Sequence, residues 1–164
     1  MQLTFSRIKK QLQDQGFTID YQDLQRPWGG FYALQEHQAT TFMQQYFMGV
    51  DVTNIDTTLD LKPKILMVAP GKRLSWQYHH RRSELWRVVE GPVGVVTSLT
   101  DKQTKVQTYK VGELITLPNG IRHRLVGLDA FGVIAEIWQH TDASSPSDED
   151  DIIRLQDDFG REKQ

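Results

Sequence analysis

The chain has 164 residues, of which 38% are hydrophobic, 10% aromatic and 24% charged. This length favours one compact domain with a single core, and this composition excludes a disordered or a fibrous protein. The formal net charge of -2 lacks the basic excess expected of a protein that mainly binds nucleic acid, and the absence of cysteine excludes disulfides, thiolate metal sites and cysteine nucleophiles.

No run of the chain approaches the roughly 18 uncharged apolar residues of a membrane span, and the N-terminus lacks the apolar stretch of a secretory signal. The absence of cysteine is compatible with a reducing compartment. We therefore expect a soluble cytoplasmic protein that associates with neither membranes nor nucleic acids.

The N-terminal region, residues 1–25, predicts a helical extension. Phe5, Ile8 and Leu12 recur at spacings of three and four with polar residues between them. This spacing is typical of a short amphipathic helix, which we expect to end at Gly16 and to cover another part of the fold.

Residues 26–141 show the pattern of a series of strands. Short runs rich in β-branched and aromatic residues are separated by Gly, Pro, Asn and Asp, without a helical pattern between them. This pattern predicts an all-β sandwich or barrel. The expected strands are FYAL, TFMQQYFMGV, KILMVAP, ELWRVVEG, VGVVTSL, KVQTYKVG, ELITLPNG, HRLVGL and FGVIAEIWQ.

Residues 142–164 predict a linker and a tail that packs on the barrel. The segment 142–151 is acidic and rich in Ser and Pro, and weak helical periodicity returns through Ile152, Leu155 and Phe159. Charge is unevenly distributed: residues 142–164 hold eight acidic and three basic side chains, whereas residues 71–91 hold five basic and two acidic ones. The near-neutral total therefore conceals a basic patch.

Potential metal ligands are concentrated between residues 70 and 91. If residues 74–79 form a strand, its period of two places Ser75, Gln77 and His79 on one face. The polar residues that follow would turn the chain, and Glu84 could then return a carboxylate toward the same face. Two nitrogen or oxygen donors and a carboxylate would thus share one pocket.

A second imidazole follows a Pro-Asn-Gly turn, which comes just before His123. Together with Gln77, His79 and Glu84, this histidine completes a set of nitrogen and oxygen ligands without sulfur. Such a set suits one divalent ion, with zinc first and Mn, Co, Fe or Ni as alternatives.

The spacing of these residues resembles the two sequence motifs of the cupin superfamily. The first cupin motif, G-x5-H-x-H-x4-E-x6-G, matches with Gln77 in place of its first histidine, and the second, G-x5-P-x-G-x2-H-x3-N, matches with Gly127 in place of its final asparagine. The resemblance implies a double-stranded β-helix, or jelly roll, with the metal inside the barrel. The matching positions are Gly71, Gln77, His79, Glu84, Gly91, Gly112, Pro118, Gly120 and His123.

Within the cupins, residues 26–161 resemble the isomerase domain of type II mannose-6-phosphate isomerases. The resemblance rests on Arg-Pro-Trp-Gly at 26–29, the Pro-Gly-x-x-Leu-Ser-x-Gln-x-His-His run, Glu-x-Trp at 84–86, the strand around Glu136, and the ending Asp-Asp-Ile-x-Arg-x-x-Asp-x-Phe-Gly-Arg. No Gly-rich nucleotidyltransferase motif precedes this region, so we expect the isomerase part without the guanylyltransferase domain of the bifunctional members. Arg81, Leu85 and Phe159 stand where the family commonly has two histidines and a tyrosine.

The resemblance implies a metal-dependent aldose–ketose isomerase. Its expected substrate is a small sugar phosphate, either the mannose 6-phosphate/fructose 6-phosphate pair or a related compound, and it allows a homodimer. Two alternatives remain open. The first is a non-catalytic, metal-containing sugar-binding or regulatory cupin, and the second is a cupin dioxygenase, which would need Fe(II) with open coordination positions.

Candidates for the catalytic base are Glu136 and Lys64, preferred because they lie on strands that match the family, and also His80 and Glu113. Basic residues could bind the phosphate, because guanidinium groups match phosphate oxygens in a bidentate geometry. We expect Arg154 to act in the active site and a substrate-binding role for Arg81, Arg82, His80 and Arg161, with Lys72 and Arg73 as solvated surface residues or further phosphate ligands. Truncation before Asp148 should then reduce turnover and leave the metal content intact.

Other conspicuous side chains are expected to have structural roles. By strand alternation, Arg122 and Arg124 should face away from His123, toward the outer surface or an interface. His37 and His140 are expected to be surface or core residues. The four tryptophans, at positions 28, 76, 86 and 138, are expected to be core or dimer contacts rather than sugar-stacking platforms.

Overall fold

The computed structural model describes residues 1–50 and 61–160, and within these ranges β-strands dominate. The helices are α1 (Gln2–Asp14), the short 3-10 helix η1 (Glu36–Gln38) and α2 (Ala39–Tyr46). The strands are β1 (Ile19–Arg26), β2 (Gly29–Leu34), β3 (Leu61–Val68), β4 (Trp76–Tyr78), β5 (Arg82–Glu90), β6 (Val93–Ser98), β7 (Gln107–Tyr109), β8 (Leu114–Leu117), β9 (Arg122–Gly127), β10 (Gly132–His140) and β11 (Ile153–Gln156).

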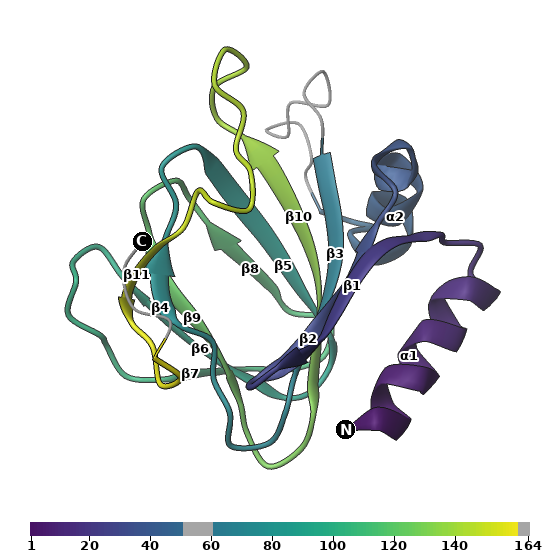
Figure 1. The fold of residues 1–164 in the computed structure, drawn as a ribbon, viewed down its shortest axis with the longest axis horizontal. Coiled ribbons are helices and arrows are strands. Elements are labelled where there is room, and N and C mark those ends of the chain that lie inside the picture. The colour runs from purple at the N-terminus through teal and green to yellow at the C-terminus, as the bar shows by residue number, and fades with distance from the viewer. Residues whose placement is uncertain (51–60, 161–164) are drawn as a thin grey trace.

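The strands form two antiparallel sheets that enclose the interior of a jelly roll. One sheet has the order β1-β2-β3-β10-β5-β8 and the other has the order β11-β4-β9-β6-β7. Figure 1 shows the two helices on the outer side of the first sheet and the C-terminal strand β11 at the edge of the second. The predicted fold class, an all-β cupin barrel with an N-terminal helix and a C-terminal tail, is confirmed.

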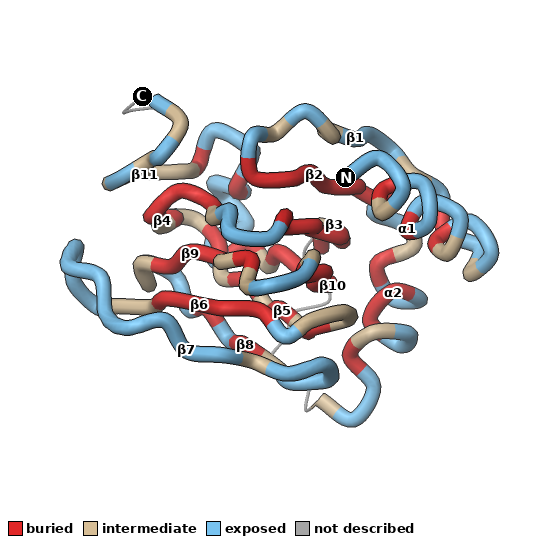
Figure 2. The backbone as a smooth tube through the Cα atoms, turned by 90° about the horizontal axis from the view of Figure 1, so that it is seen from below, coloured by how far each residue is buried: buried red, intermediate tan, exposed pale blue. Residues whose placement is uncertain are grey.

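The central strand β10 contributes side chains to two hydrophobic cores, one on each face of the larger sheet. It pairs with β3 on one side and β5 on the other, and seven consecutive residues from Gly132 to Trp138 are buried. Alternate side chains face opposite ways. Val133, Ala135 and Ile137 pack in a cluster with α1 and α2, whereas Ile134 packs in the cluster between the two sheets. Figure 2 shows mainly buried residues along β2 and β3, and exposed and intermediate residues along β1 and β7.

Helix α1 has the amphipathic character predicted for it, with Phe5, Ile8 and Leu12 buried. The first 25 residues are nevertheless not only helical. Strand β1 occupies residues 19–26 and pairs with β2 along the edge of the larger sheet. The expected boundary at residue 26 therefore falls at the end of a strand rather than at the end of a helical extension.

Two segments adopt a different secondary structure from the one predicted. The run TFMQQYFMGV was expected to be a strand, but its first part lies in α2. Phe42 and Tyr46 are four residues apart, so they share a helix face and their rings are in contact with centroids 4.7 Å apart. The weak helical periodicity of the tail was also misleading, because residues 153–156 form β11, which pairs with β4.

No helix among residues 1–50 and 61–160 is both long enough and apolar enough to span a bilayer.

Candidate active site

Strand register brings the predicted ligand positions together. Gln77 of β4 lies opposite His123 of β9, and Arg154 of β11 lies opposite Gln77 on the other side. In the larger sheet, Glu84 of β5 lies opposite Trp138 of β10. Opposed residues of an antiparallel pair have their side chains on one face. The two sheets therefore point these side chains into the space between them.

The two histidine segments are also tied together by backbone contacts. Gly120, in the Pro-Asn-Gly turn before His123, has a φ of 76°, a conformation that favours glycine. Its N–H donates a hydrogen bond of 3.0 Å to the carbonyl oxygen of His79. This turn therefore fixes where β9, and with it His123, begins relative to the β4 segment.

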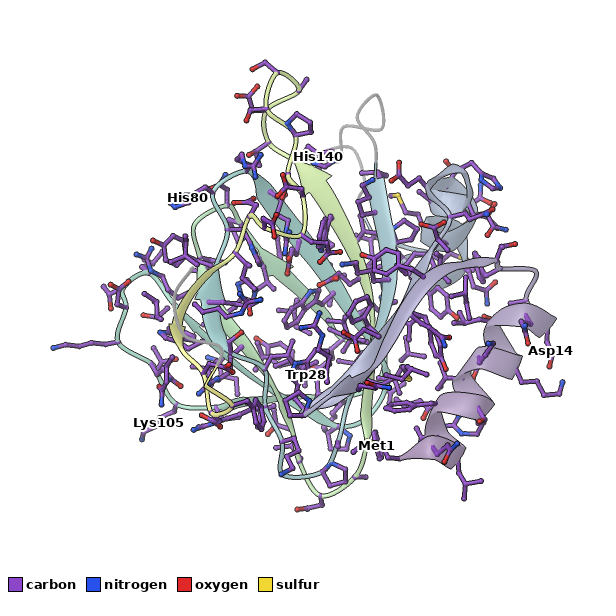
Figure 3. The ribbon with its side chains drawn as sticks, viewed as in Figure 1. Met1, Asp14, Trp28, His80, Lys105 and His140 are labelled. Carbon is purple, nitrogen blue, oxygen red and sulfur yellow. The ribbon has the colours of Figure 1, made fainter. Side chains whose placement is uncertain are left out.

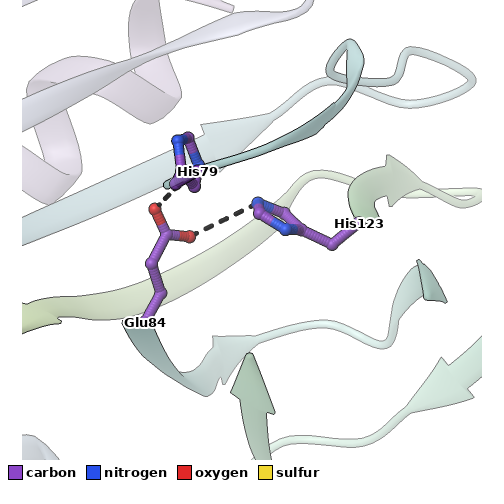
Figure 4. A group of neighbouring side chains, drawn as sticks. All are labelled: His79, Glu84 and His123. Carbon is purple, nitrogen blue, oxygen red and sulfur yellow. Dashed lines mark ion pairs between the residues drawn. The ribbon is translucent and has the colours of Figure 1, made fainter. Parts of the chain in front are cut away.

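His79, Glu84 and His123 form a buried cluster, in which one ligand atom of each residue lies within 4.8 Å of the others. The Nε2 atom of His79 is 3.2 Å from Oε1 of Glu84, and Nε2 of His123 is 3.5 Å from Oε2 of the same carboxylate. Figure 4 shows the carboxylate between the two rings. None of the three side chains is more than 3% exposed.

The hydrogen bonds of the two imidazoles prepare both Nε2 atoms to accept a ligand. Nδ1 of His79 contacts the carbonyl oxygen of Asp151 at 2.5 Å, and Nδ1 of His123 contacts the carbonyl oxygen of Ile121 at 3.0 Å. A carbonyl oxygen can only accept, so each Nδ1 carries a hydrogen, and the neutral form of either ring has its lone pair on Nε2. Burial, as the largest cause, lowers the pKa of His123 to about 4 and favours its neutral form.

These residues fit a divalent cation. Nε2 of His123 and Oε2 of Glu84 are both buried, without a hydrogen-bond partner in the described part of the chain, and they face each other as two acceptors. A cation between them would satisfy both atoms, and two imidazoles with a carboxylate are a common ligand set for zinc and related metals. Burial alone would raise the pKa of Glu84, but His79 and Arg82 hold it well below its usual range, so the carboxylate is ionised.

Gln77 lies beside this cluster. It is buried, it is opposite His123 in the register, and its Oε1 accepts a hydrogen bond of 2.5 Å from the hydroxyl of Ser75. Ser75 and Gln77 line the same cavity, in agreement with the face predicted for alternate residues. The role of Gln77 as a fourth metal ligand stays a prediction.

A cavity of about 490 Å³ opens beside the cluster, a volume typical of small-molecule sites. Its lining includes Glu84 and the tryptophans at positions 86 and 138. Lys64 and Glu136 lie opposite each other on β3 and β10, and both side chains line this cavity. The other predicted site residues that line it are Gln77, Arg82 and Arg154.

Glu136 is a carboxyl group within the buried run of β10, residues 132–138. Its two oxygens accept hydrogen bonds from the indole nitrogens of Trp86 at 2.8 Å and Trp138 at 3.2 Å. Burial, together with the negative charge of Glu84, raises the pKa of Glu136 to about 8 against the opposing effect of Lys64. Glu136 can therefore both accept and release a proton near neutral pH.

Comparison with known proteins agrees with this geometry. A family model described as mannose-6-phosphate isomerase C-terminal matches residues 35–157. The chain belongs to this family. The resemblance expected from the two motifs is thereby confirmed.

Curated members are longer proteins. Alginate biosynthesis protein AlgA of Pseudomonas aeruginosa is 30% identical over 157 residues, which cover 94% of this chain and 26% of that protein. Mannose-1-phosphate guanylyltransferase 2 of Escherichia coli O157:H7 is 30% identical over 151 residues, which cover 92% and 25% respectively. This chain thus spans only about a quarter of the length of these relatives.

A solved structure resembles the fold alone. Vicilin from Corylus avellana superposes with a TM-score of 0.54 at 16% identity, over 79% of this chain and 34% of that one. At this identity, the similarity concerns the jelly roll and not the site.

Three predicted site residues lie away from the cavity. His80 is exposed beside Tyr78, and Figure 3 shows it at the outer edge of the molecule. Arg81 binds the carbonyl oxygen of Pro146 and the carboxylate of Asp148 rather than the cavity, because the turn between β4 and β5 points both side chains outward. Glu113 is exposed, before β8. Arg161 lies outside the described residues.

Arg82 was predicted to bind the phosphate, but it contacts the metal-ligand cluster directly. Its Nε donates to Oε1 of Glu84 at 2.9 Å, and a terminal nitrogen lies 3.2 Å from Nε2 of His79. The guanidinium also stacks on Trp138, 3.5 Å from the ring centroid. A permanent positive charge is therefore in contact with two of the three cluster residues.

Arg122 and Arg124 differ from each other. Arg122 is partly exposed and pairs with Asp101, as expected for an outer position. Arg124 is only 1% exposed and donates to the carbonyl oxygen of Leu74, so the expectation of a surface role is wrong for this residue. The second sheet is covered here by the C-terminal segment, whose Asp158 lies 3.7 Å from the guanidinium.

The structural roles predicted for the tryptophans, His37 and His140 agree with the structure to different degrees. Trp76 has the expected core position and donates to the carbonyl oxygen of Asp101. The other tryptophans, at positions 28, 86 and 138, are buried but also line the cavity. His37 is exposed and His140 is buried, where its Nδ1 accepts a hydrogen bond from the N–H of Ser147.

Sequence reasoning missed the contribution of residues 147–151. Glu149 lines the cavity and pairs with Nζ of Lys64 at 2.5 Å, and it also accepts a short hydrogen bond from Tyr21. Asp151 is buried against the His79 segment. The acidic composition of this segment indicated a solvated linker. The available signal was the Asp-Asp-Ile-x-Arg ending, which linked the segment to the family without indicating its contacts.

The raised pKa of Glu136 predicts a pH-dependent stability of the metal-free protein. The group is protonated in the folded state up to pH about 8 but ionises near 4.5 in the unfolded chain, so the free energy of unfolding should fall as pH rises across this interval. Glu136→Gln cannot ionise, and its stability relative to the original protein should rise by as much as about 1.4 kcal/mol per pH unit there. Urea unfolding of both proteins at pH 5, 6, 7 and 8 measures the difference, which a constant offset would contradict.

Proposed function

We propose that this chain is a metal-dependent aldose–ketose isomerase that acts on a sugar phosphate, with mannose 6-phosphate and fructose 6-phosphate as the first candidates. The observation that carries the proposal is Glu136, a buried carboxyl group with a raised pKa that lines the same cavity as Glu84, the carboxylate of the His79–Glu84–His123 cluster. A proton-transfer group beside a metal-ligand set is what this reaction requires. The family to which the chain belongs supports the same reading.

Isomerisation moves a proton from C2 to C1 of the sugar, while a hydroxyl proton passes from the oxygen on C2 to the oxygen on C1. A divalent ion held by Gln77, His79, Glu84 and His123, with zinc first, would supply Lewis-acid stabilisation of the oxygen that gains negative charge. We assign the carbon-bound proton to Glu136, whose carboxylate takes it from C2 and returns it to C1. The two indole hydrogen bonds fix the direction of this carboxylate.

Among the charged side chains that line the cavity, the basic ones offer donors to an anionic substrate. Lys64 and Arg82 are 5% exposed each, and both line the cavity together with Arg154. Buried cations of this kind bind a phosphate more strongly than surface ones, because they are less hydrated and less screened by salt. The carboxylate of Glu149 now pairs with Lys64, and an incoming phosphate would compete with it.

The walls of the cavity also support chemistry that must exclude water. Trp86 and Trp138 are 1% and 3% exposed, and both contact Glu136. Their apolar faces keep bulk water away from the carboxylate and preserve its raised pKa. The reactive intermediate of the isomerisation would be protected in the same way.

A second candidate is a protein that binds the sugar phosphate without turnover. The contacts of Arg82 favour it, because a guanidinium already supplies positive charge to His79 and Glu84. An anionic ligand could then be held without a metal. The names of the curated relatives refer to guanylyltransfer and to alginate biosynthesis, and those proteins are about four times as long as this chain, so they do not separate the two candidates.

The test is a coupled assay of the metal-loaded protein with a panel of aldose phosphates. We expect turnover of mannose 6-phosphate or a close relative, and a far lower kcat/KM for free mannose, because binding of the phosphate contributes to stabilising the transition state. Titration with the same compounds, followed by tryptophan fluorescence, gives binding without turnover. Binding of a sugar phosphate with no conversion of any member of the panel would replace the isomerase by the binding protein.

A further inference from the structure

The segment from Ser147 to Asp151, which we call the strap, is anchored by one buried carboxylate. The side chain of Asp151 is 3% exposed, although the three residues directly before it, 148–150, are exposed. Oδ1 accepts a hydrogen bond of 3.0 Å from the N–H of His80, and Oδ2 accepts one of 2.9 Å from the N–H of Arg81. The hydroxyl of Ser147 donates a further bond of 2.8 Å to Oδ2. The strap is thus fastened to the turn that follows His79.

The main chain of the same residue reaches the metal-ligand cluster. The carbonyl oxygen of Asp151 is the partner of Nδ1 of His79, at 2.5 Å. This bond fixes the hydrogen on Nδ1 and leaves Nε2 directed at Glu84. One residue therefore combines a carboxylate that fixes the strap with a carbonyl that orients a ligand.

We propose that Asp151 is a positioning residue of the metal centre, which holds His79 in its ligand-ready tautomer and orientation by clamping the strap. The inference rests on the metal-binding part of the proposed function. It assigns no contact between Asp151 and the metal or the substrate.

The chemistry of the side chain explains why an aspartate is suited to this position. An ionised carboxylate only accepts hydrogen bonds, and here both of its oxygens face backbone N–H donors. An asparagine of the same shape would turn an NH2 group toward one of these donors, so one bond would be lost and two donors would meet. The end of the strap at Asp151 would then be held less firmly, and the carbonyl that orients His79 would be displaced with it.

Other contacts connect the strap to side chains that line the cavity. Arg82, which touches His79 and Glu84, donates to the carbonyl oxygen of Asp148 at 2.9 Å. Glu149 pairs with Lys64 from the next position in the strap. The expectation that truncation before Asp148 leaves the metal content intact is therefore revised, because such a truncation removes the hydrogen-bond partner of a ligand.

The test compares Asp151→Asn with Asp142→Asn, a matched change at an exposed carboxylate of the same acidic segment. Chelator competition with Zn2+ and Mn2+ should show affinity about 10- to 100-fold weaker for Asp151→Asn, as for other residues that orient a ligand. The control should match the original protein. Equal affinities of all three proteins would overturn the proposal.

A second readout does not depend on metal binding or turnover. In the metal-free original protein, the 15N chemical shifts of His79 should report a hydrogen on Nδ1, and in Asp151→Asn they should move toward a mixture of tautomers. This measurement is made on folded protein, so a loss of stability alone does not produce the shift. An unchanged tautomer would overturn the proposal. A protein that binds no metal but shows the shift would reject the proposed function and retain the role of Asp151.

Discussion

Replacing His123 by alanine should lower the affinity for divalent metal by more than about a hundredfold, since a ligand itself is removed and even residues that only orient ligands contribute up to that amount. The imidazole is buried, with Nε2 3.5 Å from Glu84, and nothing else in the described part of the chain offers a donor from β9 to this cluster. His79→Ala should have the same effect from β4. Elemental analysis after gel filtration, with chelator competition, measures both.

The matched control is His37→Ala, because this imidazole is exposed and far from the cluster in the sequence. Metal should raise the melting temperature of the original protein and of the control, since a ligand that binds only the folded state stabilises it. The same addition should leave His123→Ala nearly unchanged. Full metal content in both cluster variants would exclude this site.

Much of the cluster could be predicted because strand geometry is regular. A period of two is enough to place Gln77 and His79 on one face, and a short turn is enough to return Glu84 toward them. The Pro-Asn-Gly turn likewise predicts where the strand of His123 begins. Strand periodicity and turn signals are therefore sufficient to predict the ligand positions, provided that the neighbouring strands pair in the expected order.

The failures occur where tertiary contacts decide. The run around Phe42 contains aromatic residues that suit a strand, but one face of the larger sheet needs a cover, and a helix supplies it. The tail had weak helical spacing, but the free edge of β4 offers backbone partners that a helix cannot use. Neither the exposed sheet face nor the free edge is visible in the local pattern.

Site residues outside the strands were the hardest to predict. Arg81 and Arg82 are adjacent and identical and both bind the strap, yet only Arg82 also touches His79 and Glu84. Only the position at which β5 begins separates them. Asp151 was hidden for a different reason, because its effect on His79 passes through a main-chain carbonyl, which every residue possesses.

Replacing Glu136 by glutamine should lower kcat by about 10²- to 10⁴-fold, the contribution of a positioned proton-transfer group, while the metal content is retained. The amide has nearly the same shape, but it cannot take the proton from C2. Glu113→Gln is the matched control, because this glutamate is exposed on the turn before β8 and does not line the cavity. Steady-state assays with the sugar phosphate, together with exchange of its C2 hydrogen in D2O, measure both variants.

The pH profile gives an independent check on the same carboxylate. As a base, Glu136 must be ionised, so kcat/KM of the original protein should increase with pH until this group has lost its proton. Burial and the charge of Glu84 raise its pKa to about 8, and a divalent ion bound at Glu84 would offset the second cause, so the midpoint should lie at or below pH 8. If Glu136→Gln kept both the rate and the pH midpoint, the base would have to be sought at Lys64, which lies opposite it on β3.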